Sequence, residues 1–181
     1  AISALKNISE DVLADYEIDA DTISITTKFG EKITSLTADN FVLAGDKAQV
    51  TTAPTLTYNS TTNTTTGSVI VTAEDKTTKT YNIEITMRPG LESFEIEGQV
   101  GETKIETVNQ PNDDGVYTTR VTVTMPHGTT DTKVYTPTFE LGPDVVTLTD
   151  VNDYVLTSGV DEHDFANADG NKHLKLWKDA T

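Results

Sequence analysis

Short runs of alternating apolar and polar residues recur along most of this 181-residue chain. In Thr22–Thr27, Ile23 and Ile25 alternate with threonine and serine. The same period of two recurs at 69–73, 81–85 and 121–125. Successive side chains of a strand point to opposite faces of its sheet, so such runs bury one face and leave the other in water. The pattern predicts an all-β chain of short antiparallel strands, with no more helix than one turn over Ile8–Leu13 capped by Ser9.

The sequence also repeats itself at an offset of about 100 residues. A shift of 98 aligns Ile23 with Val121, Ile25 with Val123, Gly30 with Gly128 and Phe41 with Phe139. A shift of 104 places Ile70–Thr72 on Leu174–Leu176. The two copies join at Met87–Gly90, where proline and glycine would interrupt a central strand. We therefore expect two domains, residues 1–88 and 89–181.

The second copy is shorter than the first by one strand. In the first copy Asp75 is followed by a turn and then by the alternating run Thr80–Thr86, whereas the sequence reaches Thr181 within the corresponding turn. A sheet that lacks a strand exposes apolar core and unpaired backbone groups. Three explanations stay open: a fragment of a longer chain, a strand donated by another subunit, or an altered second domain.

The segment Val69–Ile85 resembles the closing hairpin of bacterial immunoglobulin-like and cadherin-like β-sandwich repeats, which end in a V-T-A-E-D-G-T-x-K-x-Y-x-V-x-V pattern. The segment Ile23–Leu43 is similar to the strand, glycine turn and x-L-x-x-x-F-x-L part of the same modules, although Lys76 stands where glycine is usual. The resemblance implies two tandem immunoglobulin-like antiparallel sandwiches, the second without its last strand. It also implies a secreted or surface-anchored stalk, adhesin, fibre subunit or virion decoration.

Composition narrows the classes of function. The net charge of −16, from 13 basic and 29 acidic residues, opposes binding to nucleic acid, whose phosphates need lysine and arginine. No cysteine is present, so disulfides and thiolate chemistry are excluded. No apolar run approaches the length of a membrane span, and we expect no membrane insertion.

We expect no enzyme activity. Of the three histidines, His127 lies in a Pro-His-Gly turn, His163 in an acidic loop and His173 on the outer face of an expected strand. The sequence has no glycine-rich phosphate loop, no G-x-S-x-G nucleophile elbow and no H-E-x-x-H motif.

One oxygen-rich cluster is a candidate cation site. It consists of Asp161, Glu162, Asp164 and Asp169, and carboxylates are the ligands that calcium prefers. The alternative is a solvated acidic loop, because Phe165 falls at the first ligand position of a helix-loop-helix calcium pattern. Apart from this calcium site we expect no cofactor.

Aromatic residues of the second copy form a candidate glycan-binding surface. Trp177 is out of phase with Leu174 and Leu176 and should point outward, where a sugar ring could stack on it. Its expected companions are Tyr117, Tyr135 and Tyr154. The alternative is that Trp177 covers a sheet edge or packs on the partner domain.

Three sequons, Asn7-Ile8-Ser9, Asn59-Ser60-Thr61 and Asn63-Thr64-Thr65, would accept N-glycans in a host that glycosylates. The function expected from all these features is a non-catalytic structural protein on a cell or virion surface, a stalk, fibre or filament subunit. Its partners would be other protein subunits, including copies of itself joined by β-strand complementation. The alternative is a glycan-binding surface module.

Overall fold

The computed structural model describes residues 1–59, 62, 64–108, 118–129, 134–150, 152–164 and 174–178. Over these residues the regular structure is β-strand, apart from one turn of 3-10 helix, η1 at Ala38–Asn40. The fold is therefore all-β, as the alternating sequence predicts. None of the described residues belongs to a helix long and apolar enough to span a membrane.

The chain divides into two compact units, which we describe separately. The first unit contains Ala1–Arg88, and the second contains Pro89–Thr107 and Thr118–Thr181.

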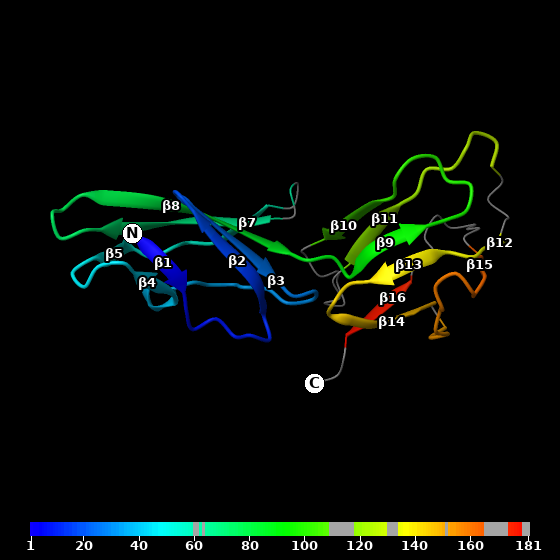
Figure 1. Ribbon diagram of the computed structural model, residues 1–181, viewed down its shortest axis with the longest axis horizontal. Helices are drawn as coiled ribbons and strands as arrows, with labels where there is room; N and C mark the ends of the chain where they lie inside the picture. The colour runs from blue at the N-terminus through cyan, green and yellow to red at the C-terminus, as the bar shows by residue number, and fades with distance from the viewer. Residues whose placement is uncertain are drawn as a thin grey trace. The chain divides into compact units, whose positions relative to one another are not determined.

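The first unit contains eight strands. They are β1 (Ile2–Leu5), β2 (Leu13–Asp19), β3 (Thr22–Thr27), β4 (Phe41–Leu43), β5 (Gln49–Thr52), β6 (Thr57–Asn59), β7 (Thr64–Thr72) and β8 (Thr78–Met87). Six of them form one sheet in the order β2-β3-β8-β7-β5, with β6 also pairing with β7 (Figure 1). The other two, β1 and β4, form a separate antiparallel pair.

Strand β8 is the central strand of the larger sheet. It runs antiparallel to β7, with Val69 opposite Tyr81, and parallel to β3, with Ile23 opposite Ile83. Because β8 pairs along both edges, it joins the β2-β3 hairpin to β7 and β5.

The core of the first unit is formed by the side chains that the period of two assigns to the inner face. Ile23, Ile25, Val69 and Val71 are all 3% exposed or less, and they pack in one cluster with Ile2, Leu5 and Phe41 of the β1-β4 pair. The expected inward faces of β3, β7 and β8 are confirmed. Tyr81 of β8 also accepts a hydrogen bond from the backbone N–H of Ile2 at 3.0 Å, which ties the two sheets together inside the core.

The expected helical signal near the N-terminus is a single turn, as predicted. The backbone N–H groups of Val12 and Leu13 both donate to the Ser9 carbonyl oxygen. The Ser9 hydroxyl accepts from the N–H of Asp11 at 3.2 Å, so this serine caps the turn.

The second unit contains the remaining strands. They are β9 (Leu91–Glu95), β10 (Lys104–Val108), β11 (Thr118–Thr122), β12 (Val134–Tyr135), β13 (Thr138–Leu141), β14 (Val145–Thr149), β15 (His163–Asp164) and β16 (Lys175–Lys178). They pair as four separate two-stranded sheets, β10-β11, β12-β15, β9-β13 and β14-β16.

Two of these pairs repeat pairs of the first unit. Phe94 of β9 lies opposite Phe139 of β13, as Leu5 of β1 lies opposite Phe41 of β4. The two phenylalanine rings stack with their centroids 6.4 Å apart. The pair β14-β16 corresponds in the same way to β5-β7.

The register of β16 corrects the offset expected for the last strand. Thr147 lies opposite Trp177 and Leu148 opposite Leu176, as Gln49 lies opposite Thr72 and Val50 opposite Val71. Leu176 therefore corresponds to Val71, at a shift of 105 and not 104. A slip of one residue exchanges the two faces of a strand, and only the shift of 105 places Leu174 and Leu176 on the core face.

Candidate strand-accepting site

Two strand edges of the second unit correspond to the edges that β8 joins in the first. Within the described residues, β11 pairs with β10 alone and β16 with β14 alone, so no strand connects the two pairs. Figure 1 draws β10 beside β11, and β14 beside β16. One edge of β11 corresponds to the edge of β3 that pairs with β8. One edge of β16 corresponds to the edge of β7 that pairs with β8. We call these two edges of the second unit the acceptor edges.

Side chains behind the acceptor edges are less buried than their counterparts in the first unit. Val121 and Val123 on the β11 segment, and Leu174 and Leu176 at β16, are only partly buried. Their counterparts Ile23, Ile25, Val69 and Val71 are 3% exposed or less. The second unit therefore has an apolar inner face like that of the first unit, but the side chains on this face are more exposed to solvent.

Two further observations indicate that side chains of the second unit are incompletely packed. The Thr119 hydroxyl oxygen on β11 is buried and has no hydrogen-bond partner within the described part of the chain. Large hydrophobic side chains that are exposed also occur only in this unit over the described residues. They are Val100, Val134, Val146, Tyr154, Val155, Val160 and Trp177. A hydroxyl buried without a partner costs on the order of 1–3 kcal/mol.

Trp177 lies on β16, beside the acceptor edge, and is 47% exposed. Its indole Nε1 donates a hydrogen bond to Thr149 Oγ1 at 3.0 Å, across the β14-β16 pair. Val155, 55% exposed, forms an isolated bridge with Thr149. The indole is thus held by one hydrogen bond while the residue stays accessible, and this exposure agrees with its phase in the sequence.

The other aromatic candidates do not all share this exposure. Tyr154 is exposed, and its hydroxyl donates to Asp161 Oδ1 at 3.2 Å. Tyr135 is 9% exposed and packs in the core of the second unit, because Val134 takes the outward position on the two-residue strand β12. Tyr135 therefore offers no ring face to a ligand. Tyr117 lies outside the described residues.

The acidic cluster has its best-defined member in Asp161. Its Oδ2 accepts from the N–H of Thr157 at 2.6 Å, and its Oδ1 accepts from Tyr154. Hydrogen bonds from Thr157, first from its side chain and then from its backbone, lower the Asp161 pKa below 3.8, and the Tyr154 hydroxyl adds to this. The charge of Asp161 in turn raises the pKa of Tyr154. The carboxylate thus already serves to close its own loop.

The remaining members of the cluster do not gather around Asp161 in the described structure. Glu162 and Asp164 are exposed, Asp164 lies on β15 opposite Val134, and Asp169 falls outside the described residues. Among the residues that the structure describes, no three His, Cys, Asp or Glu side chains are placed to hold one metal ion.

A second acidic turn, Asp150–Tyr154, is also closed by its own hydrogen bonds. Asp150 Oδ1 accepts from the N–H groups of Asn152 and Tyr154 at 2.8 and 2.9 Å. These two hydrogen bonds lower the pKa of Asp150 below 3.8, and the bond from Tyr154 has the larger effect. Carboxylates at such turns fix loop geometry.

Two of the sequon asparagines lie on the surface of the first unit. Asn7 is exposed and its Nδ2 donates to the Asp39 carbonyl oxygen at 3.1 Å. Asn59 is exposed at the end of β6, where its Oδ1 accepts from the N–H of Thr62 at 3.4 Å. Asn63 is not among the described residues.

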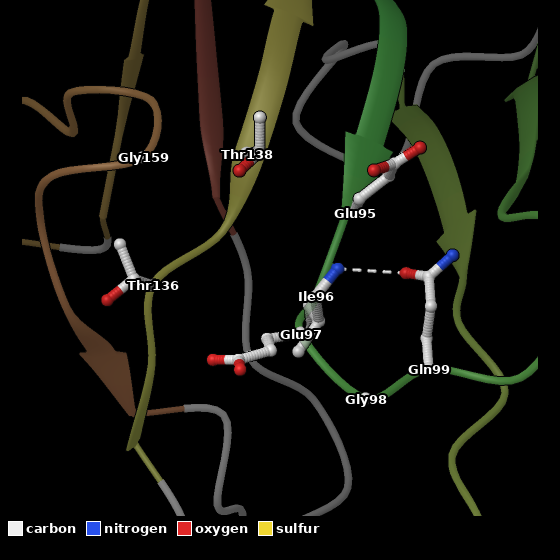
Figure 2. A pocket seen from close by; sticks show the side chains of 8 residues that line it. All are labelled: Glu95, Ile96, Glu97, Gly98, Gln99, Thr136, Thr138 and Gly159. Carbon is white, nitrogen blue, oxygen red and sulfur yellow. Dashed lines mark hydrogen bonds between the residues drawn. The ribbon is translucent and has the colours of Figure 1, made fainter.

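A hollow of about 530 Å³ in the second unit is lined by Glu95, Ile96, Glu97, Gly98, Gln99, Thr136, Thr138 and Gly159. Figure 2 shows the Glu97 carboxylate pointing toward the Thr136 side, and the Ile96 N–H bonded to Gln99 Oε1 at 2.8 Å. This bond closes the turn at Gly98, which has a φ of +86°. Its lining combines the carboxylates of Glu95 and Glu97 with the hydroxyls of Thr136 and Thr138.

Comparison with protein-family models, with curated proteins and with solved structures finds no match to this chain. The two units of the chain can still be compared with each other.

Proposed function

We propose that this protein is a non-catalytic structural subunit of two tandem immunoglobulin-like β-sandwiches, and that the second sandwich is completed by a strand from another polypeptide. One observation carries the proposal: the pairs β9-β13 and β14-β16 repeat the pairs β1-β4 and β5-β7 of the first unit, and the described residues contain no counterpart of β8. A subunit that accepts a strand and presents a complete first domain is suited to a stalk, fibre or filament on a cell or virion surface.

Strand acceptance is supported by the size of what β8 contributes in the first unit. Tyr81, Ile83 and Ile85 of β8 are buried to 2% exposed or less. Fully burying one such side chain contributes roughly 1.5–3 kcal/mol. A strand that enters between the acceptor edges would bury a comparable set of side chains and also pair the backbone groups of β11 and β16.

The acidic composition fits an exposed role. At a net charge of −16, copies of the protein repel one another except where specific contacts form, and nonspecific adhesion to polyanions is suppressed. Assembly through an inserted strand supplies such a specific contact.

The experiment for this proposal attaches a strand equivalent to β8 directly to residues 1–181. A variant with a copy of residues 77–87 directly after Thr181 carries turn and strand in the same order as the β7-β8 hairpin. Its matched control has Ile83→Lys and Ile85→Lys within the appended copy only. Trp177 is the sole tryptophan and lies on β16, so its fluorescence follows unfolding of the second unit.

We expect the appended strand to raise the denaturation midpoint of the second unit by at least several degrees, since a gain of 1 kcal/mol shifts Tm by roughly 4–8 °C in a domain of this size. The control should match the parent chain. If the variant and its control have the same midpoint as the parent, the proposal is wrong.

A second candidate function is glycan binding through Trp177. The exposed indole, held at its Nε1 by Thr149, is the observation that favours it, because aromatic faces stack on sugar rings. Retention on a glycan array that Trp177→Ala abolishes and Tyr154→Phe leaves intact would support this function. Equal retention of Trp177→Ala and the parent would exclude it.

A further inference from the structure

The first unit supplies a residue-by-residue template for the strand that the second unit would accept. This inference rests on the strand acceptance proposed above. On the outer face of the first unit, Thr22 of β3 lies opposite Asn82 of β8, and Ile70 of β7 lies opposite Thr80. All four side chains are uncharged, so no ion pair forms across β8 at these positions.

The corresponding outer positions of the second unit are both basic. At the shift of 98 that aligns β3 with β11, Thr22 corresponds to Arg120. Both aligned turns contain a glycine with positive φ, Gly30 and Gly128, which supports this alignment. At the shift of 105 set by the β14-β16 register, Ile70 corresponds to Lys175.

These two cations are accessible. Arg120 is exposed on β11. Lys175 pairs with Asp153, at 2.6 Å between Nζ and Oδ1, and its side chain still has 42% of its surface exposed. In a chain with only 13 basic residues among 181, one cation beside each acceptor edge contrasts with the uncharged positions of the first unit.

We infer that the second unit selects a strand with acidic residues at the two outward positions equivalent to Thr80 and Asn82, on either side of an inward apolar residue equivalent to Tyr81. The accepted strand thus has the pattern acidic–apolar–acidic–apolar. It runs parallel to β11 and antiparallel to β16, because β8 runs parallel to β3 and antiparallel to β7. Opposite charges directly across a strand pair stabilise it, and like charges destabilise it.

The inward residues of this strand follow from the same template. The position of Tyr81 lies opposite Leu174, and the positions of Ile83 and Ile85 lie opposite Val121 and Val123. All these second-unit side chains are partly buried and pack against the existing core. The apolar residues of the partner give affinity, and the acidic ones give selectivity and register.

Three synthetic peptides test this inference on the full 181-residue chain, with Trp177 fluorescence as the readout. The first has the chain's own sequence Thr78–Met87. The second carries Thr80→Glu and Asn82→Glu, and the third carries Thr80→Lys and Asn82→Lys. We expect the acidic peptide to bind about threefold to tenfold more tightly than the neutral one, and the basic peptide most weakly. One molar salt should reduce the difference.

The variant Arg120→Glu supplies the matched control, because it is exposed and changes one charge without altering the inner face. It should lose most of the preference for the acidic peptide and keep its affinity for the neutral one. Equal binding of all three peptides by the parent chain overturns the charge selection and leaves strand acceptance standing. Failure of all three peptides to bind overturns both proposals.

Discussion

Tyr81 is the residue that best shows how β8 holds the first unit together. It is 1% exposed, its hydroxyl accepts the N–H of Ile2 at 3.0 Å, and Lys79 Nζ lies 4.6 Å from the centre of its ring. One side chain on the central strand thus fills the core, satisfies a buried donor on β1 and supports a cation on the surface.

Replacing Tyr81 by phenylalanine keeps the ring and leaves the Ile2 N–H without its partner. We expect Tyr81→Phe to lower the unfolding free energy of the first unit by about 1–3 kcal/mol, the cost of a buried unsatisfied donor. Chemical denaturation followed by circular dichroism measures this change. The control Tyr16→Phe, on the partly exposed edge strand β2, should change stability by less. A Tyr81→Phe variant as stable as the parent would contradict the role of this hydrogen bond.

Asp161 gives the second unit a dependence on pH. Its pKa is lowered from 3.8 by the hydrogen bonds from Thr157, so the folded state binds its proton less readily than the unfolded state does. The stabilisation is therefore complete above the unfolded value of 3.8 and is lost as pH falls below it through the folded value.

Asp161→Asn should remove this part of the acid sensitivity. We expect the thermal midpoint read from Trp177 to fall less steeply in the variant than in the parent as the pH is lowered below 3.8. Glu162→Gln, a change at the exposed neighbouring residue, serves as the control and should keep the parent's slope. Identical acid slopes in Asp161→Asn and the parent would show that the loop carboxylate contributes nothing to this dependence.

At the scale of elements, the sequence predicts which side chains of a strand face the core better than it predicts which strands pair with each other. The period of two assigns Ile23, Val69 and Tyr81 to the core, and all three are buried. It does not reveal that β3 and β8 lie side by side and parallel, because an alternating run determines which side chains point inward and carries no information on which strand pairs with it.

The offset of β16 shows why the candidate site could be predicted only in part. A one-residue slip separates the shift of 104 from the shift of 105, and the register with β14 decides between them. Alternation of Leu174 and Leu176 with polar residues was the available signal, since Val69 and Val71 alternate in the same phase. The correspondence of Lys175 to Ile70 follows only from this register, whereas that of Arg120 to Thr22 follows from the shift of 98.

The two units should respond differently to the same truncation on their inner faces. Val71 on β7 is 3% exposed, whereas Val123, just after β11, is only partly buried. We expect Val71→Ala to cost about 2 kcal/mol and Val123→Ala about half of that, because less apolar area is buried around Val123. Chemical denaturation of each variant measures the two costs. In the chain with the appended strand, the cost of Val123→Ala should rise toward that of Val71→Ala, and equal costs in both chains would contradict incomplete packing.

At the scale of the whole molecule, the two units are expected to differ in stability although they share two strand pairs. The first has a six-stranded sheet organised around β8, and the second has four separate two-stranded sheets in the described residues. Strands paired along both edges open only with the whole domain, while strands paired along one edge open locally at a lower free energy. We attribute this difference to the lack of a counterpart of β8 among the described residues of the second unit.

Hydrogen exchange of the backbone amides tests that claim most directly. In the isolated chain, amides of β11 and β16 should exchange at least about tenfold faster than those of β3 and β7, which are buried in a completed sheet. After saturation with the Thr78–Met87 peptide, the β11 and β16 amides should slow toward the rates of the first unit. If β11 and β16 are as protected as β3 and β7 in the isolated monomer, the second unit is already complete and accepts no strand.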